Sequence, residues 1–155
     1  MFNVKSGFPK VLNINFHSNK FRIELRGRIT QIDGNSGSGK TLLCNVLRNI
    51  KSDIKYNHSD YDSYFNDIVV FNYKENFEGT EDLIGLQDKL IVIDRADMLD
   101  FDNSLARYIA SDRNNCYLIL ARGFINVGIS PNYICELKDT DGVISTFYDF
   151  SEKGW

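Results

Sequence analysis

One short segment constrains the fold more than any other: residues 28–50, with the sequence RITQIDGNSGSGKTLLCNVLRNI. Its first part, up to Asp33, alternates and is rich in β-branched residues, which is typical of a strand. A bend of glycine and serine follows, and apolar residues then recur at helical spacing, at Leu42, Leu43, Val46 and Leu47. The segment therefore predicts a strand, a glycine-rich loop and a helix in immediate succession.

The loop, GNSGSGKT from Gly34 to Thr41, has the composition needed to hold a chain of phosphates. Glycines allow successive amide N–H groups to point inward, and the helix that begins beyond them presents its positive end. We expect Lys40 to reach the β and γ phosphates and the Thr41 hydroxyl to bind Mg²⁺. The predicted nucleotide-binding residues are Gly34, Asn35, Ser36, Gly37, Ser38, Gly39, Lys40, Thr41 and Leu42.

The same loop matches the pattern G-x-x-x-x-G-K-[ST] in full, so the chain resembles the P-loop NTPase superfamily. A second motif, LIVID from Leu90 to Asp94, is similar to the Walker B strand, whose final aspartate holds Mg²⁺ at the carboxyl edge of the sheet. The resemblance covers residues 28–122 and implies a minimal ATPase core like that of ABC and AAA proteins. It also implies ATP and Mg²⁺ as ligands, with Thr41 and Asp94 at the metal.

The residues that would carry hydrolysis are less well defined. Arg95 follows Asp94, where many related ATPases have a glutamate that polarises water, and this argues against fast, unaided hydrolysis. Asp97 is a candidate for that role, although an ordinary loop carboxylate fits equally well. Arg122, after the CYLILA segment, stands where related ATPases sense the γ-phosphate. The predicted catalytic residues are Lys40, Asp97 and Arg122, with Glu75 and Glu78 as further carboxylates and Arg95 and Arg113 as fingers toward a neighbouring subunit.

Missing motifs narrow the class of protein. No [NT]-K-x-D motif is present, so GTP is disfavoured relative to ATP, and neither an L-S-G-G-Q signature nor a helical lid is recognisable. The leading prediction is a Mg-dependent ATP-binding protein with slow ATPase activity, acting as an energy-coupling or switch module. A non-catalytic nucleotide-binding interaction module and a small-molecule or nucleoside kinase remain open, the latter with a second pocket lined by SDYDSYF, residues 59–65.

The remaining elements predict the fold class. Val11 to Leu25 forms a hairpin, and further strands are expected at 68–71, 90–94 and 116–121 and around a turn at Asp141-Gly142. Helices are expected at 40–50, at 80–87 and after Asp102. The prediction is an α/β protein with a mainly parallel sheet of the P-loop NTPase type, helices on both faces, an N-terminal β-hairpin and C-terminal strands. Residues 1–155 form a single domain.

Composition and charge indicate which partners and which cellular compartment to expect. The formal net charge of −3 gives no general attraction to nucleic acid, although lysine and arginine crowd the N-terminal segment. No apolar run approaches the roughly 20 residues that span a bilayer, so we expect a cytoplasmic protein without a membrane contact. Three scattered cysteines in apolar surroundings predict reduced core residues. A protein partner or self-association is expected to complete the site.

Overall fold

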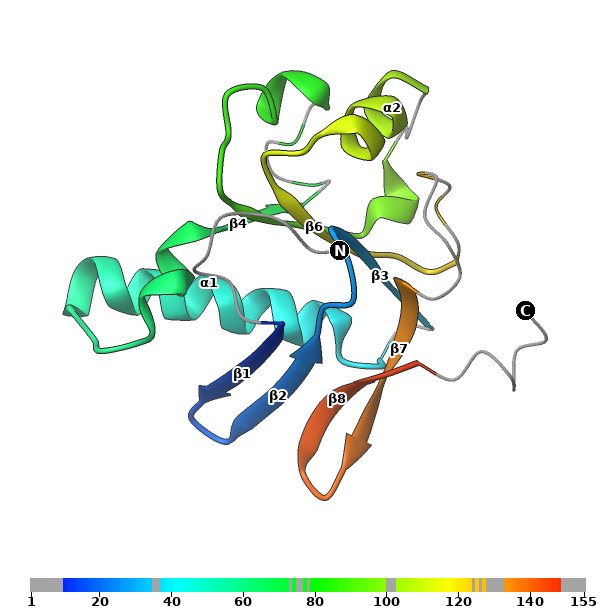
Figure 1. The fold of residues 1–155 in the computed structure, drawn as a ribbon. Helices are drawn as coiled ribbons and strands as arrows, with labels where there is room; N and C mark the ends of the chain where they lie inside the picture. Colours follow the sequence, from blue (N-terminus) through cyan, green and yellow to red (C-terminus); the bar gives the residue numbers. More distant parts are fainter. Residues whose placement is uncertain are drawn as a thin grey trace.

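We analysed a computed structural model of the chain, which describes residues 10–34, 37–72, 74, 77, 79–99, 103–123, 125, 127 and 133–148. Eight strands and two α-helices lie in this part of the chain (Figure 1). The strands are β1 (Val11–Phe16), β2 (Asn19–Glu24), β3 (Ile29–Asp33), β4 (Ile68–Asn72), β5 (Leu90–Asp94), β6 (Cys116–Leu120), β7 (Ile134–Thr140) and β8 (Val143–Phe147). The α-helices are α1 (Lys40–Asn57) and α2 (Asn103–Ser111), and short 3₁₀ turns are η1 (Ser63–Asp67), η2 (Thr80–Asp82) and η3 (Ala96–Met98).

All eight strands belong to one sheet, in the order β1-β2-β8-β7-β3-β6-β5-β4. Two neighbouring pairs are antiparallel hairpins, β1 with β2 and β7 with β8. The other five neighbouring pairs are parallel. The C-terminal hairpin is thus inserted between the N-terminal hairpin and the central strands, and Figure 1 shows the two hairpins side by side at one end of the molecule, with α2 at the other.

This arrangement corrects the predicted fold class. The sequence predicts a mainly parallel sheet with helices on both faces, but the sheet is mixed and curled, and antiparallel hairpins contribute four of its eight strands (Figure 1). Only two α-helices lie within the described residues, because the link from β4 to β5 contains the short η2 turn instead of a covering helix. The prediction of a P-loop NTPase core is therefore wrong.

Alternation along the strands explains which elements form. In β1 and β2, buried Leu12, Ile14, Phe21 and Ile23 alternate with exposed polar side chains. Every residue of β5 and β6 is buried, as expected for central strands of a sheet. The hairpin, these two buried strands and the strands that flank the Asp141-Gly142 turn confirm the prediction, and both turn residues have positive φ angles of 54° and 86°.

Other boundaries differ from the sequence-based prediction. The α1 helix continues to Asn57, seven residues beyond the predicted end at Ile50, since no glycine or proline interrupts it before His58 takes a left-handed conformation. The segment 80–87 contains the short 3₁₀ turn η2 at Thr80–Asp82 instead of a short helix. The predicted cap Asp102 lies outside the described residues.

The hydrophobic core has two parts, one on each side of the sheet. The α1 side chains Leu43, Val46, Leu47 and Ile50 pack into the larger cluster with residues of both hairpins. On the other side, Leu105 and Ile109 of α2 pack against the central strands with Tyr108 partly buried. The cysteines at positions 44, 116 and 135 are buried and free, which confirms that they are reduced core residues.

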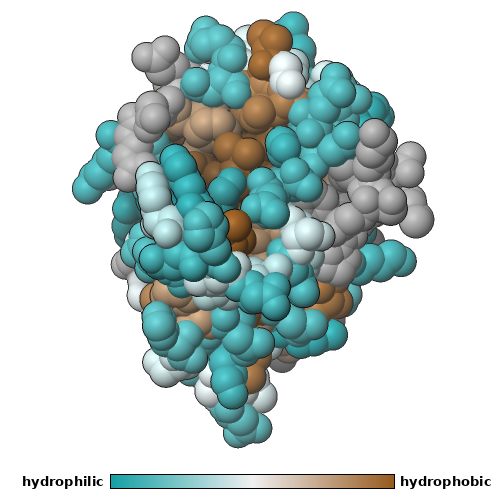
Figure 2. All heavy atoms as spheres, turned by 90° about the vertical axis from the view of Figure 1, so that its left-hand side faces the viewer, coloured by the Kyte–Doolittle hydropathy of each residue, from teal (hydrophilic) through white to brown (hydrophobic). Residues whose placement is uncertain are grey.

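The β4 strand is an edge strand, which the sequence did not predict. Ile68 is fully buried, but the next four residues are only partly buried, so IVVF is not the buried strand that its composition indicated. Figure 2 shows the side of the molecule on which the β4 edge and α1 lie: hydrophilic atoms dominate, and hydrophobic surface gathers in the upper half, at the height of β4 and η2 in Figure 1. None of the described helices is long and apolar enough to cross a membrane.

Candidate functional site

The loop between β3 and α1 has an unusual backbone. Gly34, Gly37 and Gly39 have φ angles of 137°, 87° and 111°, a region that side chains strongly disfavour. Gly39 is the N-cap of α1 and makes no side-chain cap hydrogen bond, so the helix begins without the usual oxygen partner for its first amides. The predicted ligands Asn35 and Ser36 lie outside the described residues.

Lys40 is the most unusual residue of this loop, because its side chain is a cation with only 5% of its surface exposed. Its ammonium group donates one hydrogen bond to the Gly34 carbonyl and another, of 3.1 Å, to the Ser38 hydroxyl. Burial lowers the pKa of Lys40, while the negative charges of Asp33 and Asp97 raise it in part. The lysine is therefore folded back over its own loop, and an anion placed beside it would favour its charged form.

A cavity of about 240 Å³ opens at this end of α1. Its walls are the loop and the first turn of the helix on one side and two arginines on the other. The lining residues are Gly37, Gly39, Lys40, Thr41, Leu42, Arg95 and Arg122. Three of these side chains are cations, and no carboxylate is among the described residues that line it, so the cavity suits an anion.

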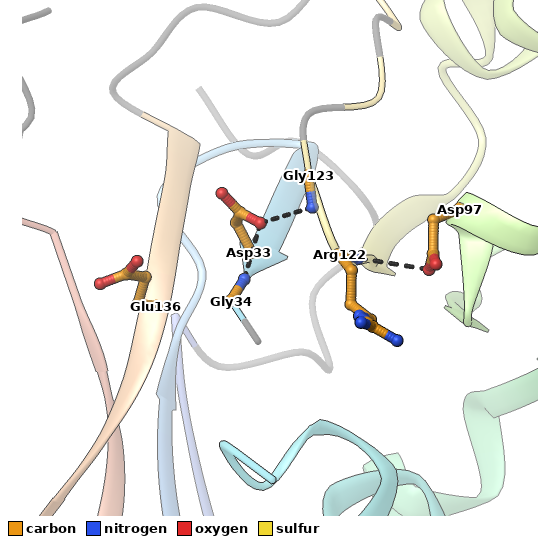
Figure 3. Close-up of a pocket in the computed structure, with 6 residues that line it drawn as sticks. All are labelled: Asp33, Gly34, Asp97, Arg122, Gly123 and Glu136. Carbon is orange, nitrogen blue, oxygen red and sulfur yellow. Dashed lines mark hydrogen bonds between the residues drawn. The ribbon is translucent and has the colours of Figure 1, made fainter. Parts of the chain in front are cut away.

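A larger cavity of about 590 Å³ lies on the other side of Arg122. Figure 3 shows its lining residues, which come from the ends of β3 and β6, from the start of β7 and from the η3 turn. They are Asp33, Gly34, Asp97, Arg122, Gly123 and Glu136. Arg122 is exposed and lines both cavities, so a cationic space adjoins one with three carboxylates at this residue, whose side chain points away from Asp33 and Glu136 in Figure 3.

Asp33 connects the loop to the end of β6. Its Oδ1 atom accepts hydrogen bonds from the amides of Gly34, at 2.6 Å, and Gly123, at 2.7 Å (Figure 3). These contacts hold the first residue of the loop and the residue after Arg122 at one point. Sequence reasoning missed Asp33, although its position as the last strand residue before the glycines was a usable signal. It also missed Glu136, for which the sequence contains no signal.

Asp97 holds the other side of the same turn. Its Oδ1 accepts the Arg122 amide at 3.2 Å, and its Oδ2 lies 3.5 Å from the Arg95 guanidinium. Burial alone would raise the pKa of Asp97, but the hydrogen bonds from Arg122 and Arg95 outweigh it and lower that pKa. Asp97 is therefore an ionised group with both oxygens in use, which is better suited to positioning Arg122 than to taking a proton from water.

Asp94 lies at the end of β5, and only 2% of its surface is exposed. Its Oδ2 accepts a hydrogen bond from Asn72 at 3.2 Å, and its Oδ1 has no hydrogen-bond partner within the described part of the chain. Burial raises the pKa of Asp94 despite the nearby arginines 48 and 95. The buried Cys44 thiol, whose pKa is raised by burial and then by the Asp94 charge, places this carboxylate beside the second turn of α1.

The predicted site is thus brought together only in part. Lys40, Thr41, Leu42 and Arg122 line the cationic cavity with two of the glycines, and Asp97 is joined to Arg122. Asp94 is not among the described residues that line either cavity. Arg113 instead donates a hydrogen bond to the Ala110 carbonyl near the end of α2, and Glu75 and Glu78 lie outside the described residues.

Comparison of the chain with models of known protein families, with curated proteins and with solved structures found no match. The resemblance inferred from the two motifs is therefore supported neither by a family match nor by the arrangement of the strands in the sheet. The function has to be argued from the two cavities and their residues alone.

Proposed function

We propose that this protein binds a nucleoside triphosphate, with ATP as the expected nucleotide, and that its phosphates occupy the cationic cavity at the start of α1. The observation that carries the proposal is that the buried Lys40 shares a cavity with Arg95 and Arg122, and that no Asp or Glu is among the described residues that line this cavity. Three cations, the positive end of an 18-residue helix and a glycine loop together favour a multiply charged anion. The choice of ATP over GTP still rests on the missing guanine motif.

Magnesium fits this proposal through the phosphates. No group of three or more potential metal-ligating side chains occurs in the described residues, so the protein alone offers a poor cation site. Mg²⁺ commonly keeps several waters and uses one or two protein oxygens together with substrate phosphates. The exposed Thr41 hydroxyl lines the cavity and would hold the ion directly. Asp94 lines neither cavity and would hold it through a coordinated water, with an Oδ1 that has no hydrogen-bond partner among the described residues. When bound, the ion supplies neutralisation of phosphate charge.

Hydrolysis, in this proposal, is slow and needs a partner or self-association. The residue after Asp94 is an arginine, and the candidate base Asp97 has a lowered pKa and both oxygens in hydrogen bonds. Arg122 is the best-placed group to stabilise charge on a transferred phosphoryl group, because it is exposed at the cavity wall while its backbone is held by Asp97. Such a protein would act as an energy-coupling or switch module.

The test is the affinity for a fluorescent ATP analogue in the presence of Mg²⁺, measured for the wild type, Lys40→Ala and the exposed control Lys55→Ala. We expect Lys40→Ala to lose binding by at least about 30-fold, since it removes a buried charge contact worth about 2 kcal/mol. Lys55→Ala should bind as the wild type does. Thermal melting checks that both variants are folded, and equal affinity of folded Lys40→Ala and wild type would refute the proposal.

The larger cavity favours a second candidate, phosphoryl transfer to a small acceptor with hydroxyl groups. It adjoins the cationic cavity through Arg122, and its carboxylates Asp33, Asp97 and Glu136 make it acidic, which suits an acceptor that carries hydroxyl or ammonium groups. In that reaction, the acceptor oxygen bonds to the γ-phosphorus, the bond from that phosphorus to the β-phosphate oxygen breaks, ADP leaves, and the hydroxyl proton of the acceptor is released to water. ADP release measured with and without a panel of polyols and amino alcohols separates the two candidates, because hydrolysis needs no acceptor.

A further inference from the structure

The two β-hairpins present a polar face on the side of the sheet that does not pack on α1. Alternation places Leu12, Ile14, Phe21 and Ile23 in the core, so the intervening side chains of β1 and β2 point outward. The register continues this face across the neighbouring strands, because Asn13 pairs with Arg22, Arg22 with Ser145 and Ser145 with Lys138. One row of side chains therefore crosses four strands, and we call this surface the hairpin face.

The hairpin face is cationic although the chain as a whole carries a net charge of −3. Lys20, Arg22 and Lys138 are exposed, and the structure gives none of them a carboxylate partner within the described residues. Glu24, the acidic residue on β2, is engaged by the Arg26 guanidinium at 3.2 Å. The face thus offers three cations to an external anion and carries a second carboxylate, Glu136, two residues from Lys138, where the face meets the larger cavity.

An aromatic ring lies beside one of these cations on the same face. The Lys138 ammonium lies 3.7 Å from the ring centroid of Phe147. Phe147 is only partly buried and stands next to Glu136 on the neighbouring strand. Lys138 and Arg22 both pair with Ser145, two residues before Phe147, so the ring combines a stacking surface with nearby charges for a phosphate backbone.

We propose that the hairpin face binds single-stranded nucleic acid. The cations from Lys20 and Arg22 to Lys138 would contact the phosphodiester backbone, Phe147 would stack with a base, and Asn13 and Ser145 lie in the same row as hydrogen-bonding groups. An anionic membrane fits less well, because the exposed residues of β1 and β2 are asparagine, lysine and arginine, and none of them is an apolar anchor. An acidic polypeptide would bind the three cations of the face but would not explain the Phe147 ring beside them.

The experiment measures fluorescence anisotropy of labelled oligo(dT) and oligo(U) of about 12 nucleotides, a length within the range of known single-strand sites. If three phosphates are neutralised, the logarithm of the binding constant falls with a slope of about −2 against the logarithm of salt, so affinity drops about 20-fold between about 50 and 200 mM salt. The two oligonucleotides distinguish DNA from RNA as the source of the strand.

Three variants locate the binding. Lys20→Gln combined with Arg22→Gln should reduce the slope to about −0.7, whereas the matched pair Lys55→Gln with Arg107→Gln, on exposed parts of α1 and α2, should leave it unchanged. Phe147→Leu should weaken binding about tenfold without changing the slope. Since Phe147 is partly buried, circular dichroism checks that the Phe147→Leu variant is folded. The variant Lys20→Gln with Arg22→Gln changes only exposed residues, so it tests the proposal even if Phe147→Leu does not fold.

Several results would overturn the proposal: no oligonucleotide binding, equal loss in the matched pair, or no loss in folded Phe147→Leu. Competition by polyaspartate at equal charge concentration would assign the face to acidic polypeptides, and preferential binding of phosphatidylserine vesicles would assign it to a membrane surface. Lys40 lies on the other side of the β7–β8 hairpin from the hairpin face, so Lys40→Ala should leave the affinity for the oligonucleotide unchanged. A failure here is therefore distinguishable from a failure of nucleotide binding.

Discussion

Asp33 offers the sharpest test of how the candidate site is held together. Its Oδ1 accepts the amides of Gly34 at 2.6 Å and Gly123 at 2.7 Å, and the second contact joins residues 90 positions apart in the chain. A hydrogen bond to a charged group contributes about 1.5–3 kcal/mol, and the lower value applies here because Gly123 is exposed. Asp33→Ala should therefore lower the free energy of unfolding by about 3 kcal/mol. Asp33→Asn keeps one acceptor oxygen and should lose about half of that.

The assay is urea denaturation followed by circular dichroism at neutral pH. With a slope of about 2 kcal/mol per M, the Asp33→Ala midpoint should fall by about 1.5 M. Asp60→Ala is the matched control, since Asp60 is an exposed carboxylate, and it should stay within about 0.5 kcal/mol of the wild type. A change below 0.5 kcal/mol in Asp33→Ala would refute the role assigned to the two contacts. Equal losses in Asp33→Ala and Asp33→Asn would show that charge, and not acceptor geometry, is what matters.

Two further substitutions test buried polar groups. Burial raises the pKa of Asp94, so its carboxylate destabilises the fold as pH rises through the interval from its ordinary to its raised pKa. Asp94→Asn should therefore raise the free energy of unfolding at pH 7, and the difference should shrink on acidification. A variant that is less stable than the wild type at pH 7 would contradict this. Tyr117→Phe removes the 2.6 Å hydrogen bond that the tyrosine hydroxyl donates to Asp112, and it leaves the 2.8 Å hydrogen bond from Asn115 to Asp112. Calorimetry should show a melting temperature about 4–8 °C below that of the wild type. An unchanged melting temperature would exclude a stabilising role for the hydroxyl.

Local patterns in the sequence predicted local structure well. The alternation of residues 11–25 and the Asp141-Gly142 turn correspond to β1–β2 and to the β7–β8 turn. The change from alternation to helical spacing after Asp33 corresponds to the end of β3, the glycine loop and the start of α1. These features depend on neighbouring residues, and their physical causes are therefore visible in a short window of sequence.

The arrangement of strands could not be obtained in the same way. A pattern of alternating residues identifies a strand without naming its neighbours, and the pairing of Phe21 with Ile144 joins residues more than a hundred positions apart. The two motifs suggested a parallel core followed by terminal strands, whereas the C-terminal hairpin lies between β2 and β3. For the same reason, IVVF looked like an interior strand although β4 forms the edge of the sheet.

The candidate site shows the same division between local and distant information. The glycine conformations and the placement of Lys40 follow from the loop sequence, but the bond from Asp33 to Gly123 and the position of Glu136 depend on which strands are neighbours. Asp94 illustrates the reverse case. It ends a buried strand as predicted, yet its described contacts are with Asn72 and the second turn of α1, and not with the cavity beside Lys40.

The β7–β8 hairpin, which corrects the predicted fold, also lies between the two proposed binding sites. A side chain at position 39 of the glycine loop would come within 3.5 Å of Ile144 and 3.7 Å of Leu137. Lys138 is the next residue of β7, and because alternate residues of a strand face opposite sides, it points away from the loop onto the hairpin face. A packed strand transmits displacement because interiors have few voids. The glycine loop proposed to bind phosphates and the proposed nucleic-acid surface therefore lie on two sides of one hairpin, and under both proposals this hairpin would connect the nucleotide site to the nucleic acid.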